Sequence, residues 1–226
     1  MATLGNSKQI IVGAAEVYIS LQGALEYSSG SGSAAVYNFA GSGSVSSIPA
    51  FVPGTKYADT VAADTSNWSS VGYTSNGLEL QFQPDFGEVQ VDQLLDVARL
   101  FKQGMRVNMV TAFAEGTLEN LVTAAAFLSS DLSGPSTERT LVLASGNLGE
   151  VPLERSIIAI GPGTGDPDAT GAAAKERVYV ANRVLSIESV NATAKRDAPT
   201  MFEVTFRLLP ANNGVYGKLV DRVVGP

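Results

Sequence analysis

The sequence predicts a mainly β protein, built as a sandwich or barrel with one flanking α-helix. Several stretches alternate apolar and polar residues with a period of two, as strands that bury one face do. One segment, 117–128, has the clear spacing of an amphipathic helix. Hydrophobic residues make up 45% of the 226 residues, enough for the core of one large all-β domain, so we expect 1–226 to form a single domain.

The most regular alternation lies in 77–92, after a first strand expected over 10–20. We predict a hairpin of two strands, 77–83 and 87–92. The segment Pro84-Asp85-Phe86-Gly87 is expected to form its turn, because proline presets φ and Asp and Gly suit the positions that follow. Further strands are predicted at 105–113, 139–144, 155–160, 177–190 and 201–209.

Two segments have helical spacing. Apolar residues at 94, 97, 98 and 101 predict a short helix over 94–101. The longer helix, 117–128, has Thr117 as its expected N-cap and Glu119 near its positive N-terminal end. One apolar stripe should bury this helix on the chain's own sheet; it consists of Leu118, Leu121, Val122 and Ala125.

Residues 22–66 differ in composition, being low in charge and rich in Gly and Ser. Such tracts are usually flexible loops or linkers. Aromatic residues interrupt this one, however, and a pure linker would lack such anchors. Two interpretations stay open: a long inserted arm that docks on another surface such as a neighbouring chain, or a mobile surface loop. The residues expected to anchor such an arm are Tyr37, Phe39, Phe51 and Tyr57.

The charge and the missing residue types exclude several classes of function. The net charge is -7, from 22 acidic and 15 basic residues, which disfavours a surface that grips nucleic acid. The chain has no cysteine and no histidine, which removes disulfides, thiolate chemistry, the Ser-His triad and most zinc sites. No run approaches the ~20 apolar residues that cross a bilayer, so we expect no membrane span.

The motifs that suggest chemistry are incomplete. The Gly-rich segment 161–165 lacks the rest of a phosphate loop. Residues 166–171 resemble the start of a calcium loop, but Arg177 stands where a bidentate carboxylate belongs. Glu79 and Glu88 lack the aromatic walls of a glycosidase cleft. We therefore expect no enzyme, no cofactor and no metal.

Three consecutive stretches resemble the major tail protein of long-tailed, non-contractile bacteriophages. They read WSSVGYTSNG from residue 68, then LELQFQPDFGEVQVDQ, then RLFKQGMRVNMVTAFAEGTLENL. The opening KQIIVGAAEVYISLQG is similar to the N-termini of such proteins in phages of actinobacteria. The resemblance covers roughly 68–128 and 8–20, whereas the C-terminal half matches only in its strand-rich character.

The resemblance implies a tail-tube subunit, in which a β-barrel or sandwich core with one helix assembles into six-membered rings. The rings would stack into a hollow tube around a tape-measure protein, and double-stranded DNA would later pass through the bore without specific binding. The same resemblance implies contacts with a tail terminator and with distal tail or baseplate proteins. It also implies a location in the virion, after assembly in the cytoplasm of the bacterial host.

The polar face of the expected hairpin suits such a bore. Lys and Arg would hold the phosphates of a passing polyanion, so acids and neutral amides make the better lining. We expect this face to line the lumen with Glu79, Gln81, Gln83, Glu88, Gln90 and Asp92. The alternative is an ordinary outer face, although a plain surface normally mixes both signs of charge.

Two other functions stay open. A carbohydrate-binding or adhesin-like β module would use Trp68 and Tyr73 as a stacking platform. An enzyme with a carboxylate pair would need two acids that converge in one cleft.

Overall fold

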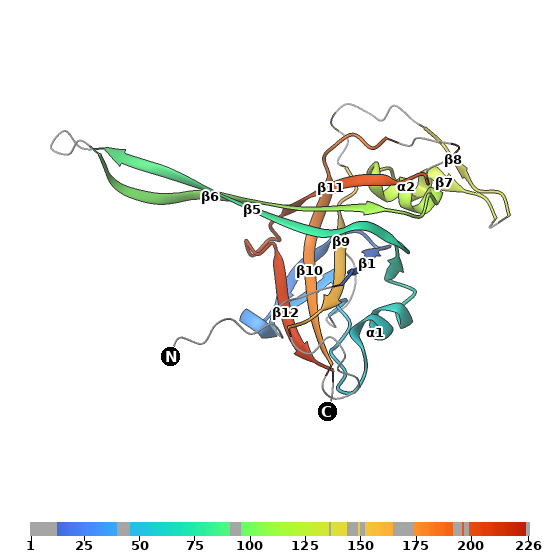
Figure 1. The fold of residues 1–226 in the computed structure, drawn as a ribbon, viewed down its shortest axis with the longest axis horizontal. Helices are drawn as coiled ribbons and strands as arrows, with labels where there is room; N and C mark the ends of the chain where they lie inside the picture. Colours follow the sequence, from blue (N-terminus) through green and yellow to red (C-terminus); the bar gives the residue numbers. More distant parts are fainter. Residues whose placement is uncertain are drawn as a thin grey trace.

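The computed structural model describes residues 13–39, 46–90, 96–135, 137–143, 149, 152–164, 174–191, 196 and 199–224. Over these residues the fold is mainly β, as predicted, with one eight-stranded antiparallel sheet and two short helices (Figure 1). The elements are β1 (Glu16–Ser20), β2 (Leu25–Ser29), β3 (Val36–Phe39), α1 (Tyr57–Ala63), β4 (Trp68–Ser70), β5 (Thr74–Gln90), β6 (Val97–Phe113), α2 (Leu118–Ala124), β7 (Leu132–Ser133), β8 (Thr140–Leu141), β9 (Arg155–Pro162), β10 (Lys175–Ser186), β11 (Phe202–Leu209) and β12 (Gly217–Val223).

The large sheet runs in the order β4-β1-β9-β10-β11-β6-β5, and β12 also pairs with β10. β11 and β12 follow one another along one edge of β10: β12 pairs with 175–181 and β11 with 183–186. The sheet therefore divides near Asn182, and the β11-β6-β5 part covers one face of β1, β9 and β10. This arrangement makes the sandwich.

The strands β1, β9 and β10 are buried on both faces, and β9 has six buried residues in succession, 155–160. Ile157 and Ala159 point into the first core, against β6, β11 and α2. Ile158 and Ile160 point into the second core, against β2, β3 and α1. The near-continuous apolar run of β9 is the pattern expected of a strand covered on both sides.

The described parts of 22–66, residues 22–39 and 46–66, pack on their own chain, so the expectation that their aromatic residues anchor an arm between rings is wrong. Tyr37 and Phe39 are buried and Tyr57 is completely buried, all within the second core. Phe51 is partly exposed, and its ring lies 4.5 Å from that of Tyr57. Tyr37, Phe39 and Tyr57 therefore anchor the segment on the subunit's own body, where the burial of each stabilises the fold by about 1.5–3 kcal/mol.

Tyr18 lies in the second core with its hydroxyl 3.1 Å from a carboxylate oxygen of Glu16. Burial, followed by the hydrogen bond to Glu16, raises the pKa of Tyr18 to about 12 from its ordinary 10.0. Burial also raises the pKa of Tyr57. Both phenols are neutral when protonated, so the folded state holds these protons more tightly than the unfolded chain does.

We expect the folded state to lose stability at alkaline pH through Tyr18. This contribution is complete below about pH 10 and is lost as the pH rises to about 12, at about 1.4 kcal/mol for each unit of pKa difference. The check is urea unfolding of the wild type and Tyr18→Phe at about pH 9 and about pH 11. The wild type should lose more stability than the variant over this interval, and parallel losses would contradict the assignment.

The helix α2 lies within the predicted segment 117–128 and starts as predicted. The Thr117 hydroxyl accepts a hydrogen bond from the Asn120 backbone N–H at 3.2 Å. The helix ends at Ala124, four residues earlier than expected, while α1 was not predicted from the sequence.

The buried side of α2 is rotated slightly from the predicted stripe. Val122 is buried and Leu121 packs against the first core. Leu118 and Ala125 are only half-buried, and Ala124 occupies a fully buried position. The helix is short, so its orientation is set by packing against β11 rather than by the apolar pattern alone.

The turn predicted at 84–87 is absent, because β5 continues through it to Gln90 as one strand of 17 residues. The helix predicted at 94–101 is also wrong over its described residues: 97–101 begin β6 and pair with β5. Residues 94 and 95 lie outside the described part of the chain. Cross-strand pairing over the full length of both strands outweighs the local turn and helix signals.

Gly87 has a role other than a turn. A Cβ at this position would come closest to Nε2 of Gln103 and within 2.6 Å of Cζ of Phe101, which lies opposite it on β6. The missing side chain therefore lets the aromatic ring lie over the strand. At Gly104, in contrast, a Cβ would meet nothing within 4 Å.

We expect Gly87→Val to loosen the paired strands locally, with a melting temperature close to that of the wild type because Gly87 lies away from both cores. The measurement is amide hydrogen exchange of residues 97–103, whose protection should fall by about tenfold, which corresponds to ~1.4 kcal/mol of local opening free energy. Gly104→Ala is the matched control and should leave protection unchanged. Equal exchange in both variants would contradict the role of Gly87.

The other strands lie close to the predicted segments. β9, β10 and β11 overlap 155–160, 177–190 and 201–209, while β8 has only two residues. β1 covers Glu16–Ser20; residues 10–12 of the predicted first strand lie outside the described residues. Over the described ranges, no helix has the length and apolar character needed to cross a membrane.

Candidate assembly surface

The outer halves of β5 and β6 project from the sandwich as a two-stranded ribbon, which we call the arm (residues 82–90 and 97–105). Figure 1 shows it extending away from the body, on the side opposite α2 and the β7–β8 pair. The two strands pair with each other from residue 74 to residue 90 of β5, with bulges near Phe86 and Gln90. Only β6 pairs with β5 in the described structure.

The arm exposes large apolar side chains to solvent: Phe82, Phe86, Val89, Leu100 and Phe101. Phe86 is 53% exposed and Leu100 is 59% exposed. These two lie as diagonal neighbours on one face, because Phe86 pairs with Lys102 and Glu88 pairs with Leu100. Exposed apolar side chains gathered on one projecting element indicate a protein–protein contact.

The polar face predicted from the hairpin is only partly assembled in the structure. Glu79, Gln81 and Gln83 share one face of β5, and Nε2 of Gln81 donates a hydrogen bond to Glu79 at 3.0 Å. Leu78 and Leu80 lie on the other face and pack against the first core.

Glu88 does not belong to this polar face. No turn interrupts β5, and the extra residue of the bulge near Phe86 belongs to β6. Side chains therefore keep alternating along β5, and Glu88 lies on the other face of this strand from Glu79. The two carboxylates are also nine positions apart, about 30 Å along a strand, and cannot act together on one substrate. Gln90 ends β5, and Asp92 lies outside the described residues.

Neighbouring strands add positive charge to the polar face. Arg106 of β6 pairs directly with Gln83 of β5. Gln81 of β5 pairs with Asn108 of β6, and Asn108 pairs in turn with Arg207 of β11. Directly opposed residues share a face, so both arginines join the polar face. Both side chains are exposed. The expectation of a face free of bases is therefore wrong.

The helix α2 does not cover the polar face. Ala124 and Leu121 of α2 pack into the first core, which lies on the opposite side of β6 and β11. The polar face is bordered instead by residues 188–191 and 199–201, which form a hollow with Glu79 and Glu203.

The stacking platform expected for a carbohydrate module is not formed. Trp68 is buried in the second core, where its Nε1 donates to the Ser47 carbonyl at 3.2 Å. Tyr73 is 80% exposed and stands apart from it. A sugar ring therefore cannot stack on both.

Several titratable groups with shifted pKa values belong to pairs that join neighbouring strands. Arg177 of β10 makes a two-pronged ion pair with Asp221 of β12, at 2.5 and 2.7 Å. This hydrogen bonding lowers the pKa of Asp221. Hydrogen bonding to Glu154 likewise raises the pKa of Arg183. These pairs hold strands together and are not arranged around a cleft.

Within the described ranges, no group of three or more acidic side chains is placed to hold a metal ion. The calcium-like segment 166–171 lies outside those ranges. Comparison of the chain with protein-family models and with curated proteins found no match.

Proposed function

We propose that this chain is the subunit of a bacteriophage tail tube, which self-assembles into stacked six-membered rings. The observation that carries the proposal is the arm: a paired ribbon that leaves the body and exposes five large apolar side chains. The resemblance of 68–128 to major tail proteins supports it, because that segment contains β5 and β6.

The arm gains from contact with another molecule. A two-stranded hairpin alone is marginally stable in water, and the arm has no third strand in the described structure. Burying each large apolar side chain in a contact contributes about 1.5–3 kcal/mol. A subunit whose stable form is an assembly would have such an element, and a monomeric binding module would not need it.

Free strand edges also favour assembly. In the described structure β5 pairs only with β6, and β12 pairs only with β10, so each has one open edge. Open edges promote uncontrolled pairing unless they are covered. A head-to-tail contact between copies covers them, and it closes into a ring when the rotation between copies permits.

In such a tube, Glu79, Gln81 and Gln83 are our candidates for the lumen. Arg106 and Arg207 lie on the same face, so acids and bases are mixed there. The two arginines are diagonal neighbours and would contact phosphates of double-stranded DNA in such a bore, but phosphate contacts carry no sequence information, so the DNA would still pass without specific binding. The remaining partners follow from the resemblance: the tape-measure protein, the tail terminator and the distal tail or baseplate proteins. The tube would be assembled in the bacterial cytoplasm and carried in the virion.

Negative-stain electron microscopy of the purified protein over a range of concentrations tests the proposal. We expect rings or hollow tubes of uniform diameter. Particles that stay monomeric at high concentration, also after addition of preformed tail ends, would contradict it. Glycan binding by such monomers would favour the carbohydrate module instead.

A further inference from the structure

An apolar groove lies between the root of the arm and the body. It has a volume of about 570 Å³ and is walled by β5 and β6 on one side and by β10, β12 and the β11–β12 connection on the other. Tyr216 of that connection donates a hydrogen bond to the Met105 carbonyl at 2.8 Å, which ties the root of the arm to the body. The volume falls within the range of about 300–1,000 Å³ that is typical of binding pockets.

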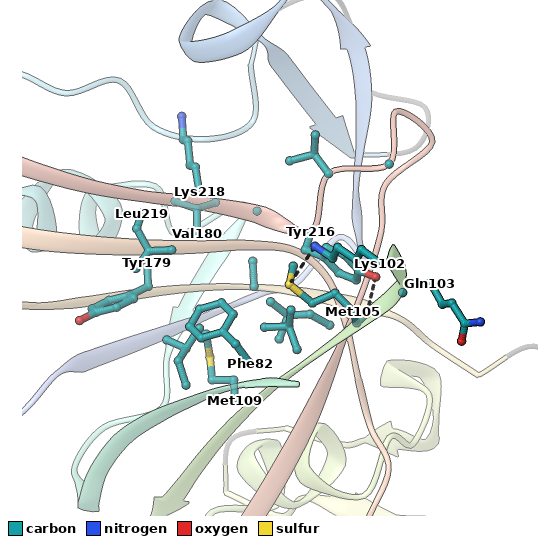
Figure 2. Close-up of a pocket in the computed structure, with 18 residues that line it drawn as sticks. Phe82, Lys102, Gln103, Met105, Met109, Tyr179, Val180, Tyr216, Lys218 and Leu219 are labelled. Carbon is teal, nitrogen blue, oxygen red and sulfur yellow. Dashed lines mark hydrogen bonds between the residues drawn. The ribbon is translucent and has the colours of Figure 1, made fainter. Parts of the chain in front are cut away.

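The side chains around the groove are mostly apolar. Figure 2 shows Phe82, Met109 and Tyr179 gathered on one side of it, with Lys218 directed away. Leu219 stands directly opposite Tyr179 and therefore shares its face; it is 56% exposed. Exposed apolar residues thus border an apolar floor, and this surface is open to a partner.

The groove and the arm are matched by their apolar side chains and not by net charge. The lining residues include no Asp or Glu, and Lys102 stands at the rim with its Nζ 3.8 Å from the sulfur of Met105. Farther out on the arm, the exposed acids Asp85 and Glu88 are balanced by the exposed bases Arg99 and Lys102. An arm without net charge and with exposed Phe and Leu side chains suits an apolar groove whose lining contains no acid.

The arm cannot fill the groove of its own subunit. Its root residues Phe82 and Met105 already line the groove, and the strands then run away from the body. Leu100 is five residues beyond Met105 on β6, which is about 17 Å at about 3.4 Å per residue. The outer part of the arm and the groove can therefore meet only between two copies.

We propose that the groove receives the outer part of the arm, with Phe86 and Leu100, from a second copy of this chain. The inference rests on the proposed self-assembly and names the contact that would drive it. The contact is heterologous, because the two surfaces lie at different places on the molecule. Each added copy brings both a free arm and a free groove, so the contact can propagate from copy to copy.

Disulfide cross-linking tests the contact, and the chain contains no cysteine that would interfere. The variant Leu100→Cys with Leu219→Cys places one thiol on the arm and one at the groove, both at exposed positions. Under mild oxidation we expect a ladder of covalent dimers, trimers and larger species. A disulfide within one chain is excluded, because its two Cα atoms must lie within about 7 Å of each other.

The control pairs Leu100→Cys with Tyr73→Cys, since Tyr73 is exposed and is not among the residues of the groove. We expect at least tenfold less ladder from the control, and no species beyond dimer from either single variant. Phe86→Cys with Val215→Cys serves as a second groove pair if the first does not fold by circular dichroism.

Two failures are distinguishable. If the wild type forms rings or tubes but neither groove pair cross-links above the control, the groove assignment is overturned and the proposed function stands. If the wild type forms no assembly under any condition, the proposed function itself fails. A reciprocal dimer without larger species would also overturn the propagating contact.

Discussion

Replacing Phe86 and Leu100 together by glutamate is expected to abolish the assembly of rings or tubes and to leave the body folded. Each side chain contributes about 1.5–3 kcal/mol when it is buried in a contact. Losing both weakens every arm contact by more than about a hundredfold, since 1.4 kcal/mol corresponds to a factor of ten. An assembly repeats the same contact in every copy, so we expect the assembled fraction to fall to background.

The measurement combines negative-stain microscopy with sedimentation of the assembled fraction. Thermal unfolding should be unchanged within experimental error, because neither residue belongs to the two cores. Tyr73→Glu is the control: it introduces one glutamate, half the added charge, in place of an exposed aromatic side chain away from the arm. Assembly that persists in the double variant, or that is lost equally in the control, would contradict the role of the arm.

The fold class was predictable because alternation depends on burial of one strand face, which the sequence records directly. β9 shows the complementary case: its run Ser-Ile-Ile-Ala-Ile is apolar without alternation, and it is covered on both faces. β12 was not predicted. In β12 the apolar residues Leu219 and Val223 are exposed, while the charged residue Arg222 points inward to Glu176. The sequence pattern of β12 therefore does not show which face is buried.

The paired strands of the arm, β5 and β6, were predicted wrongly for a different reason. Pro84 to Gly87 has the composition of a turn, and the spacing of 94–101 fits a helix, but both signals are local. What decides between the alternatives is the pairing partner, which lies many residues away. Gly87 illustrates the difference: it makes room for the side chains of Phe101 and Gln103 on the other strand and does not form a turn.

The candidate polar face shows the same limit. The sequence of β5 alone predicts a face of acids and amides, and Glu79, Gln81 and Gln83 do share one face. The two arginines enter from β6 and β11, and their alignment depends on a register that a single strand does not specify. A lining inferred from one strand therefore says little about the charge of a whole face.

The second core is held by an ion pair that the sequence did not indicate. Glu176 of β10 lies 3.7 Å from Nη1 of Arg222 on β12, and accepts a hydrogen bond at 3.0 Å from the Tyr57 N–H that begins α1. Arg222 in turn donates to the carbonyls of Val52 and Thr55, at 2.8 and 3.1 Å. Both charged side chains are largely buried, so this network fastens the segment before α1 to the sheet.

We expect Glu176→Ala to destabilise the protein by about 3–5 kcal/mol, because it leaves the Arg222 charge buried without its carboxylate and removes an acceptor at the start of α1. Urea unfolding measures this as a lower midpoint with an unchanged slope. Replacing both residues by leucine should cost less than the sum of the two single changes, since no unpaired charge remains.

Arg177→Ala is the matched control for Glu176→Ala. Arg177 is the next residue of β10, pairs with the same strand through Asp221, and faces the opposite side, where both partners are partly exposed. Such an exposed pair contributes only about 0.2–1 kcal/mol. If the two changes cost the same, the Glu176–Arg222 pair does not fasten residues 51–57, and the burial of Tyr57 in the second core would be what holds this segment on the sheet.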